Sequence, residues 1–396
     1  MALPIEGIHS FCQSREGAEK LTSAELKSLG QLLAGFEPQE AAKLDDVSYE
    51  TKRTHIKSIN SKLGFSRQID LVAELIAGLL LEIVASSEVS KDTSSFEKYF
   101  TRYAPRKTRL HRIVGKSGKT HRIIDIGPAQ GRPIVSIHTT LIGTVDDSFS
   151  DVLEDHNIRI IWPVRHGALN EDDPLLPFEE HVEAALDGIY AAIQFTGADA
   201  APIHTIGSSA YLAIKFAKRY PDMVTSLILQ GTGTLQTNRM FANQKILRSI
   251  CKLATKNPLT LNLVFKFLDA KLNNPEAALS FFSKTYKSSP KDLVHIEAEF
   301  GPPDFGERLR MFIQSSLHSI VHDFRFAGEK YWQTATEIDT PLYFIHGTDD
   351  GVCPISEIPK LIEDIGRGEL LPIEGCGNMT SYEHLPQTMK IISCLL

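Results

Sequence analysis

Hydrophobic positions in the first 84 residues recur at the spacing of helices. Within residues 22–35 and 48–64, leucine and isoleucine side chains return every three or four residues, which places them on one face of a helix. Thr22 and Glu25 have the spacing of a capping box, and Ser48 is a favoured N-cap. Four helices are therefore predicted, over residues 22–35, 38–44, 48–64 and 68–84.

Beyond residue 100 the pattern changes to short apolar runs separated by longer amphipathic stretches. The runs predict two strands around a turn at 116–119, followed by further strands over 133–138, 159–163, 203–207, 224–230 and 341–346. The stretches 178–195 and 210–219 predict helices between them. Strands that alternate with helices favour a mostly parallel sheet covered by helices on both faces.

Domain boundaries follow from this change of pattern. We predict an all-α domain over residues 1–84, a linker over 85–104 whose first part is rich in serine, and an α/β domain over 105–396. Residues 232–336 interrupt the alternation, and we interpret them as a helical cap over the carboxyl edge of the sheet. The cap phenylalanines either line an apolar pocket or form the core of the cap, and they are Phe241, Phe265, Phe267, Phe281 and Phe282.

Composition narrows the class of protein. The chain has 396 residues, of which 42% are apolar and 23% are charged, values that exclude a largely disordered or fibrous protein. Its five cysteines are scattered and form no C-x-x-C pair, so neither a disulfide framework nor a metal site is expected. The longest apolar run, residues 71–84, contains two glutamates and is a poor membrane span, and the first twenty residues do not resemble a signal peptide. We expect a cytoplasmic protein without a cofactor.

Charge is distributed unevenly along the chain. The net charge is -7, yet residues 91–122 hold ten basic and two acidic residues, a local excess of +8. Residues 48–67 hold five basic residues and one acid, a local excess of +4. Because a protein binds phosphates through one basic face rather than through its net charge, both segments are candidate nucleic-acid contacts. The alternative for each segment is a charged surface that only faces solvent.

The segment 48–67 has the pattern of a recognition helix in a helix-turn-helix. Lys52, Arg53 and Lys57 are predicted to share the side of this helix that faces away from its apolar residues. Basic side chains on that side of a recognition helix reach phosphates and base edges in the major groove. The alternative is an ordinary helical bundle with a solvated face.

Residues 21–64 resemble the LuxR-type helix-turn-helix family. The residues that carry the resemblance are Leu21, Thr22, Glu25, Gly35, Glu40, Ala41, Ala42, Ser48, Thr51, His55, Lys62, Leu63 and Gly64. The resemblance implies double-stranded DNA as a partner and a homodimer as the binding form. The DNA contacts that it implies are Ser48, Thr51, Lys52, Arg53, His55 and Lys57. Lys52 stands where the family usually has valine, so we expect an altered base preference there with no loss of phosphate affinity.

Residues 105–396 resemble the α/β-hydrolase fold. The segment 207–211, Gly-Ser-Ser-Ala-Tyr, is similar to the nucleophile elbow G-x-S-x-G, with Ser209 at the nucleophile position and Tyr211 in place of the last glycine. The segment 346–350 is similar to the acid loop of the family, with Asp350 as the acid. Asn378 stands where the family has its catalytic histidine. The family's His-Gly loop appears as His138, Thr139 and Thr140.

The asparagine at position 378 decides the expected chemistry. A serine hydroxyl attacks an ester only when a base removes its proton, and an amide side chain cannot do so near neutral pH. We therefore interpret Ser209, Asp350 and Asn378 as a vestigial triad that binds without efficient turnover. Backbone N–H groups near Thr140 and Ala210 would hold a carbonyl or carboxylate. The resemblance thus implies a ligand site formed by Thr139, Thr140, Ser209, Ala210 and Asn378.

Together the two resemblances predict a ligand-responsive, DNA-binding transcription regulator with a small organic ligand. The alternative is an active serine esterase or lactonase that degrades its own signal molecule, with His384 or His346 as the base. A third hypothesis is a domain of hydrolase fold that serves only as a dimerisation scaffold, because a fold does not determine a function.

Overall fold

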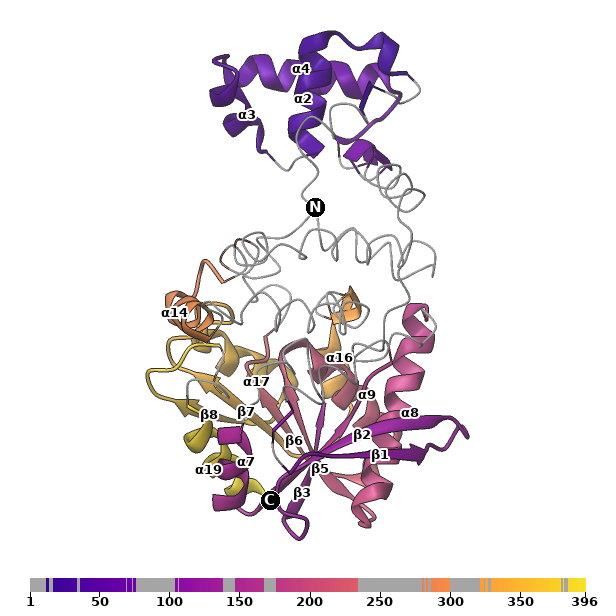
Figure 1. The fold of residues 1–396 in the computed structure, drawn as a ribbon, viewed down its shortest axis with the longest axis vertical. Helices are drawn as coiled ribbons and strands as arrows, with labels where there is room; N and C mark the ends of the chain where they lie inside the picture. The colour runs from indigo at the N-terminus through magenta and orange to yellow at the C-terminus, as the bar shows by residue number, and fades with distance from the viewer. Residues whose placement is uncertain are drawn as a thin grey trace. The chain divides into compact units, whose positions relative to one another are not determined.

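In the computed structural model the chain forms two compact units, Met1–Ser90 and Lys91–Leu396 (Figure 1). We call them unit 1 and unit 2. The structure describes residues 12–13, 17–33, 36–68, 70–72, 74–75, 104–105, 107–137, 147–166, 176–233, 280, 283, 286–299, 321–323, 325–326, 329–378, 380 and 384–396.

Unit 1 is built from short helices whose ends follow the capping signals of the sequence. Its elements are η1 (Ala18–Lys20), α2 (Ser23–Leu33), α3 (Pro38–Leu44) and α4 (Tyr49–Lys62). Before α2, the backbone N–H of Thr22 donates to Glu25 and the N–H of Glu25 donates to the Thr22 hydroxyl, which completes the capping box. Ser48 caps α4 by accepting a hydrogen bond from the backbone N–H of Thr51 at 3.0 Å.

The core of unit 1 lies where α2 and α4 pack against each other. Leu29 of α2 and Ile59 of α4 are buried together with Cys12, Leu21, Leu71 and Leu75. Of the predicted fourth helix, the structure describes helical residues only as far as residue 75. The rest of that helix, the residue Gly35 and the serine-rich segment 85–95 lie outside the described residues.

Unit 2 contains an eight-stranded sheet with the order β1-β2-β4-β3-β5-β6-β7-β8. Strands β1 and β2, and β2 and β4, are antiparallel, whereas every other neighbouring pair is parallel. The strands are β1 (Arg109–Val114), β2 (Thr120–Ile126), β3 (Arg132–Ile137), β4 (Ile158–Pro163), β5 (Ala201–Ile206), β6 (Val224–Gln230), β7 (Leu342–Gly347) and β8 (Glu369–Ile373).

Helices cover this sheet on both sides (Figure 1). The helical elements are α7 (Asp147–Asp155), α8 (Phe178–Thr196), η3 (Gly207–Ser209), α9 (Ala210–Arg219), η4 (Pro221–Met223), α14 (Pro290–Glu299), α16 (Tyr331–Ala335), η5 (Ile355–Glu357), α17 (Ile358–Ile365) and α19 (Leu385–Leu395). Helices α8, α9, α16 and α17 share one large apolar core with the sheet. Helices α7 and α19 contact each other and pack against β4 and β8.

The predicted strands correspond to β1 through β7, with ends that differ by at most two residues. Strand β8, which has five residues and contains Pro372, was not predicted from the sequence, and neither were helices α7, α17 and α19. The predicted cap ends too late, because Tyr331 and Ala335 of α16 are buried in the core of the sheet rather than in a separate layer. The cap phenylalanines Phe241, Phe265, Phe267, Phe281 and Phe282 lie outside the described residues. No helix in the described part of the chain is long and apolar enough to cross a membrane.

Candidate functional site

Four residues that follow parallel strands meet at the carboxyl edge of the sheet in unit 2. Thr232, two residues after β6, donates its hydroxyl to the carbonyl oxygen of Gly207, which follows β5. A Cβ atom at Gly231 would lie 3.3 Å from Nδ2 of Asn378, in the loop after β8. Nδ2 of Asn378 in turn donates to Oδ2 of Asp350, in the loop after β7, at 2.8 Å. Because ligands of open parallel sheets bind at this edge, we define Gly207, Thr232, Asp350 and Asn378 as the candidate site.

The sharp turn between β5 and the following helix falls at Gly207, not at Ser209. Gly207 is the first residue after the strand and has a φ of +59°, a conformation that glycine adopts without steric cost. Ser209 lies two residues further on, with helical φ and ψ of -66° and -12°. The nucleophile of an elbow sits on the turn itself, so the predicted placement of Ser209 is wrong by two residues.

The hydroxyl of Ser209 faces the protein interior. It is fully buried and lies 2.8 Å from the carbonyl oxygen of Ile206 and 3.0 Å from that of Ile137, either of which accepts its proton. It also accepts a hydrogen bond from the backbone N–H of Ile206. Ser209 therefore ties the start of α9 to the ends of β5 and β3, and its oxygen is not available to a substrate.

The structure also affects the other ligand contacts that were predicted beside Ser209. The backbone N–H of Ala210 bonds to the carbonyl oxygens of Gly207 and Ser208, and Ala210 is fully buried, so its predicted role as an oxyanion donor is wrong. Gly207 and Ser208 are the half-exposed residues of this turn. Thr139 and Thr140, together with His138, lie outside the described residues.

Asp350 is buried, and each of its two carboxylate oxygens contacts two polar groups. Oδ1 accepts hydrogen bonds from the backbone N–H groups of Val352 at 2.8 Å and Cys353 at 2.7 Å. Oδ2 accepts from Asn378 and lies 3.0 Å from Nε2 of His346. These contacts fix Asp350 in one orientation, with its outer oxygen directed at position 378.

A second carboxylate approaches the site from α14. The buried Asp292 accepts a hydrogen bond from the backbone N–H of Asn378 at 3.0 Å and another from the hydroxyl of Ser289. Asn378 therefore bridges two buried carboxylates, one through its main chain and one through its side chain. Burial, followed by the charges of Asp350 and Asp292, raises the pKa of the nearby Cys353 thiol well above its usual range, so this buried cysteine stays protonated.

Neither histidine that was considered as a replacement base is placed to act as one. His346 is fully buried, with Nε2 2.5 Å from the carbonyl oxygen of Cys353 and on the inner side of Asp350. His384 precedes α19 and pairs through Nδ1 with Gln387 at 2.6 Å. Among the described residues, no group of three histidine, cysteine or acidic side chains could hold a metal ion.

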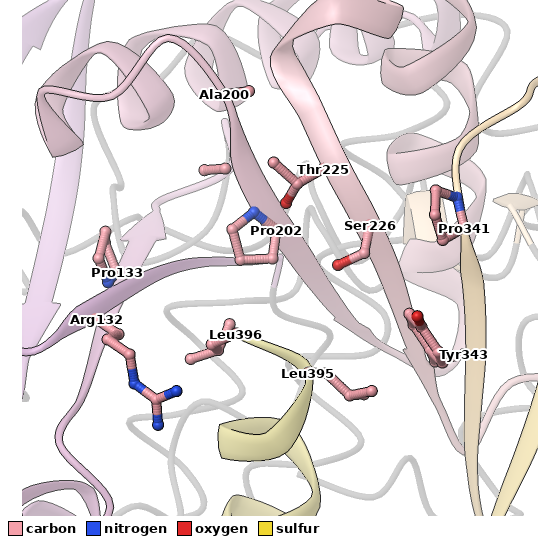
Figure 2. Close-up of a pocket in the computed structure, with 11 residues that line it drawn as sticks. Arg132, Pro133, Ala200, Pro202, Thr225, Ser226, Pro341, Tyr343, Leu395 and Leu396 are labelled. Atoms are coloured by element: carbon pink, nitrogen blue, oxygen red, sulfur yellow. The ribbon is translucent and has the colours of Figure 1, made fainter.

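A separate hollow of about 400 Å³ lies at the opposite, amino edge of the sheet (Figure 2). Pro133, Pro202 and Pro341 line it together with the end of α19, and the buried hydroxyl of Ser226 has no hydrogen-bond partner among the described residues. Arg132 at its rim donates to the carbonyl oxygen of Ser393 at 2.7 Å. None of the described residues that line the hollow has an acidic or histidine side chain.

In unit 1, helix α4 presents only part of the predicted basic face. Arg53 and Lys57 are exposed, and Arg53 makes a surface contact with Glu50 at 3.2 Å. Ser48 and Thr51 interact at the N-terminus of α4 through their hydroxyls. His55 is half-buried, with Nδ1 3.1 Å from the hydroxyl of Ser28 on α2.

Lys52 does not lie on the exposed face of α4, so its predicted contact with phosphates is wrong. Only 1% of its surface is exposed, because position 52 shares the buried side of α4 with Ile56 and Ile59. Its ammonium group donates to Ser28 at 2.9 Å, to Gln31 at 2.8 Å and to Asp45. Burial alone would raise the pKa of Asp45, but hydrogen bonds from Lys52, Lys27 and Gln31 outweigh it and lower the pKa to about 2.

Comparisons with known proteins support the fold of unit 2. No protein-family model matches the sequence, and no curated protein matches it. A thermophilic esterase from Thermogutta terrifontis, crystallised with malate, matches with a TM-score of 0.50 and 15% identity over 72% of this chain and 97% of that one. Naproxen esterase from Bacillus subtilis matches with a TM-score of 0.50 and 12% identity over 78% and 99%, and a serine hydrolase from Cycloclasticus zankles with 0.50 and 12% over 73% and 97%.

At these identities the likeness establishes the fold alone. The chain therefore contains an α/β-hydrolase fold, and the resemblance of residues 105–396 to that fold is confirmed. The resemblance of residues 21–64 to the LuxR-type family has no matching family model and stays a prediction.

Proposed function

We propose that this chain is a DNA-binding regulator whose α/β-hydrolase-fold unit binds a small organic ligand without efficient turnover. The observation that carries the proposal is the presence of Gly207 on the turn where an elbow has its nucleophile. Glycine has no side chain to attack an ester, and Asn378 has no titratable nitrogen to activate water or a hydroxyl. The acid, Asp350, is the member of the triad that is retained.

The proposed ligand site is the carboxyl edge of the sheet around Gly207 and Asn378. Replacing a nucleophile by glycine leaves room there, and Gly207 and Ser208 are half-exposed. The side-chain oxygen of Asn378 remains an acceptor for a hydroxyl or N–H group, because its nitrogen is used by Asp350. A ligand with one such donor and a carbonyl or carboxylate suits these groups.

The proposed DNA contact is the exposed side of α4, with Arg53 and Lys57 as phosphate-binding or base-reading side chains. The arrangement of α2, α3 and α4, with α4 opened by the Ser48 cap, supports a helix-turn-helix. By the LuxR-type resemblance, we propose that the binding form is a homodimer on double-stranded DNA.

The proposed DNA binding is tested by selecting bound sequences from a random double-stranded library with the purified full chain. We expect one enriched motif with two related half-sites, and an affinity that falls steeply as salt rises from about 50 to about 200 mM. A chain that enriches no motif, or binds all sequences equally, contradicts the proposal.

The proposed ligand binding is tested by native mass spectrometry of the purified chain, together with measurements of turnover on a panel of acyl esters. We expect a co-purified small molecule or a saturable binder, and no turnover above the solvent background. Turnover of esters at a rate that depends on enzyme concentration and pH would instead favour the esterase alternative.

A further inference from the structure

The β1–β2 hairpin forms one edge of the sheet in unit 2. Among the described strands, β1 has a neighbour on one side only, so its other side presents main-chain N–H and C=O groups without strand partners. Such an edge is a template for an added strand, which makes the side chains of β1 decisive for what binds there.

One face of β1 is committed to the interior of unit 2. Arg109 makes a bidentate pair with Asp125, at 2.8 and 2.9 Å, and His111 packs on Phe195 with ring centroids 4.5 Å apart. Ile113 packs against the main apolar core. These contacts hold the strand in register and leave the side chains of its opposite face available for binding.

The opposite face of β1 is open and carries an alternation of apolar and basic side chains. Leu110 is 41% exposed and Val114 is 63% exposed, and the exposed Arg112 lies between them. Arg112 has no ion pair among the described residues, and the register sets it directly opposite Arg122 of β2. Arg112 is thus an exposed cation with which an acidic side chain on an added strand would pair.

We propose that the edge of β1 binds an extended segment of a partner protein in which one acidic residue lies between two apolar residues at alternate positions. The main chain of that segment would continue the sheet beside β1. Its acidic side chain would pair with Arg112, and its two apolar side chains would cover Leu110 and Val114, since side chains of neighbouring strands lie side by side on one face.

Two other occupants fit this surface less well. A second copy of β1 would bring Arg112 against another basic strand, because residues 109–122 hold five lysine or arginine residues and no acid. A nucleic-acid backbone would satisfy Arg112 but would leave the two exposed apolar side chains uncovered. The alternation of Leu110, Arg112 and Val114 is matched only by a strand with the complementary alternation.

The test uses the full chain and two capped heptapeptides in which threonine alternates with valine, glutamate and valine, or with valine, lysine and valine. Fluorescence anisotropy of the labelled peptides measures binding, and hydrogen exchange locates it. We expect the glutamate peptide to bind at least about tenfold more tightly than the lysine peptide and to slow exchange of the β1 amides.

A charge exchange makes the test specific. Arg112→Glu is expected to reverse the ranking of the two peptides, whereas Lys119→Glu, the same charge change in the turn beyond β1, leaves the ranking as in the wild type. Unchanged thermal transitions of both variants confirm that they are folded. Equal affinities for the two peptides, no binding of either, protection outside residues 109–114, or a ranking unaffected by Arg112→Glu would each overturn the proposal.

Discussion

The side-chain amide of Asn378 donates a hydrogen bond to the outer carboxylate oxygen of Asp350, 2.8 Å away. In a catalytic triad the acid orients the base through such a hydrogen bond, and in our proposal Asp350 is that acid. The group that Asp350 contacts is an amide, and the turn after β5 carries Gly207. In our proposal two of the three functional groups are therefore absent, so restoring one of them alone is expected to be insufficient.

We expect esterase activity to appear only when both missing groups are restored. In Gly207→Ser/Asn378→His, a hydroxyl on the turn and an imidazole beside Asp350 recreate a nucleophile and a base. Turnover of p-nitrophenyl acetate should exceed that of either single variant by at least about tenfold. Serine at a φ of +59° costs about 1 kcal/mol, a cost visible as a lower thermal midpoint of Gly207→Ser.

Ser209→Ala is the matched control for this experiment. Because the Ser209 hydroxyl bonds to the carbonyl oxygens of Ile137 or Ile206, its removal should lower the free energy of unfolding by about 1 kcal/mol. It should leave the ester background of the wild type unchanged. A loss of wild-type turnover in Ser209→Ala would show that Ser209, not the turn residue, is a nucleophile.

The buried pair of Lys52 and Asp45 predicts unequal costs for removing its two members. Asp45→Ala leaves the Lys52 ammonium buried with Ser28 and Gln31 as its partners among the described residues, and should cost about 3 kcal/mol of unfolding free energy. Lys52→Met fills the same space with an apolar chain and leaves Asp45 paired with Lys27 at 2.9 Å, so it should cost within about 1 kcal/mol.

The two units can be followed separately in this measurement. Trp162 and Trp332 are the two tryptophans of the chain and both belong to unit 2, so their fluorescence reports unit 2. A loss of helical circular dichroism that no change in tryptophan fluorescence accompanies reports unit 1. In the Lys52→Met background, Asp45→Ala should cost much less than in the wild type. Equal costs in the two backgrounds would mean that the pair does not act as a unit.

Local signals in the sequence predicted much of this structure, and long-range packing decided the rest. The Thr22–Glu25 capping box and the Ser48 cap depend on neighbours within three residues, so they could be read directly. The match to G-x-S-x-G placed the turn at Ser209 and not at Gly207, because the pattern alone does not show at which of these residues the strand ends. The position of that strand end is set by pairing with β3 and β6.

Lys52 illustrates a second limit of sequence analysis. A lysine next to Arg53 on a basic helix is assigned to the surface by composition alone. Its periodicity with Ile56 and Ile59 was the available signal for burial, since positions four and seven residues apart share one helix face. The partners that make burial tolerable are Gln31 of α2 and Asp45 at the C-terminal end of α3, and they could not be anticipated from spacing within α4.

Basic residues on the exposed side of α4 should affect DNA binding, whereas the buried Lys52 should not. With the sequence selected by the wild type as probe, Arg53→Ala and Lys57→Ala should each weaken binding and reduce the slope of log affinity against log salt by about 1. Lys52→Met should leave that slope unchanged, because the buried ammonium group does not reach a phosphate. A smaller slope in Lys52→Met, or unchanged slopes in both exposed variants, would contradict this assignment of faces.

His204 is a buried side chain of β5 in the middle of the sheet. Its Nε2 lies 2.9 Å from the amide oxygen of Gln230 and its Nδ1 lies 2.9 Å from the hydroxyl of Ser136. Because an amide oxygen can only accept, Nε2 carries the proton and Nδ1 accepts from Ser136, so both nitrogens are satisfied in the neutral form. Burial lowers the pKa of His204 to about 4, although the hydrogen bond to Gln230 acts in the opposite direction.

The pKa of His204 in the folded state lies below the ordinary value of 6.5, so the unfolded chain binds more protons between about pH 6.5 and about pH 4. The free energy of unfolding of unit 2 should therefore fall as the pH is lowered through that range, by about 3 kcal/mol more in the wild type than in His204→Gln. Tryptophan fluorescence during denaturant titrations at each pH measures the difference.

Asp125 titrates in a lower pH range than His204. Burial alone would raise the pKa of Asp125, but hydrogen bonds from Arg109 and Arg159 lower it to about 2, so the stability that it contributes is lost only below about pH 4. Parallel curves for wild type and His204→Gln above pH 4 would show that His204 is not the group that titrates.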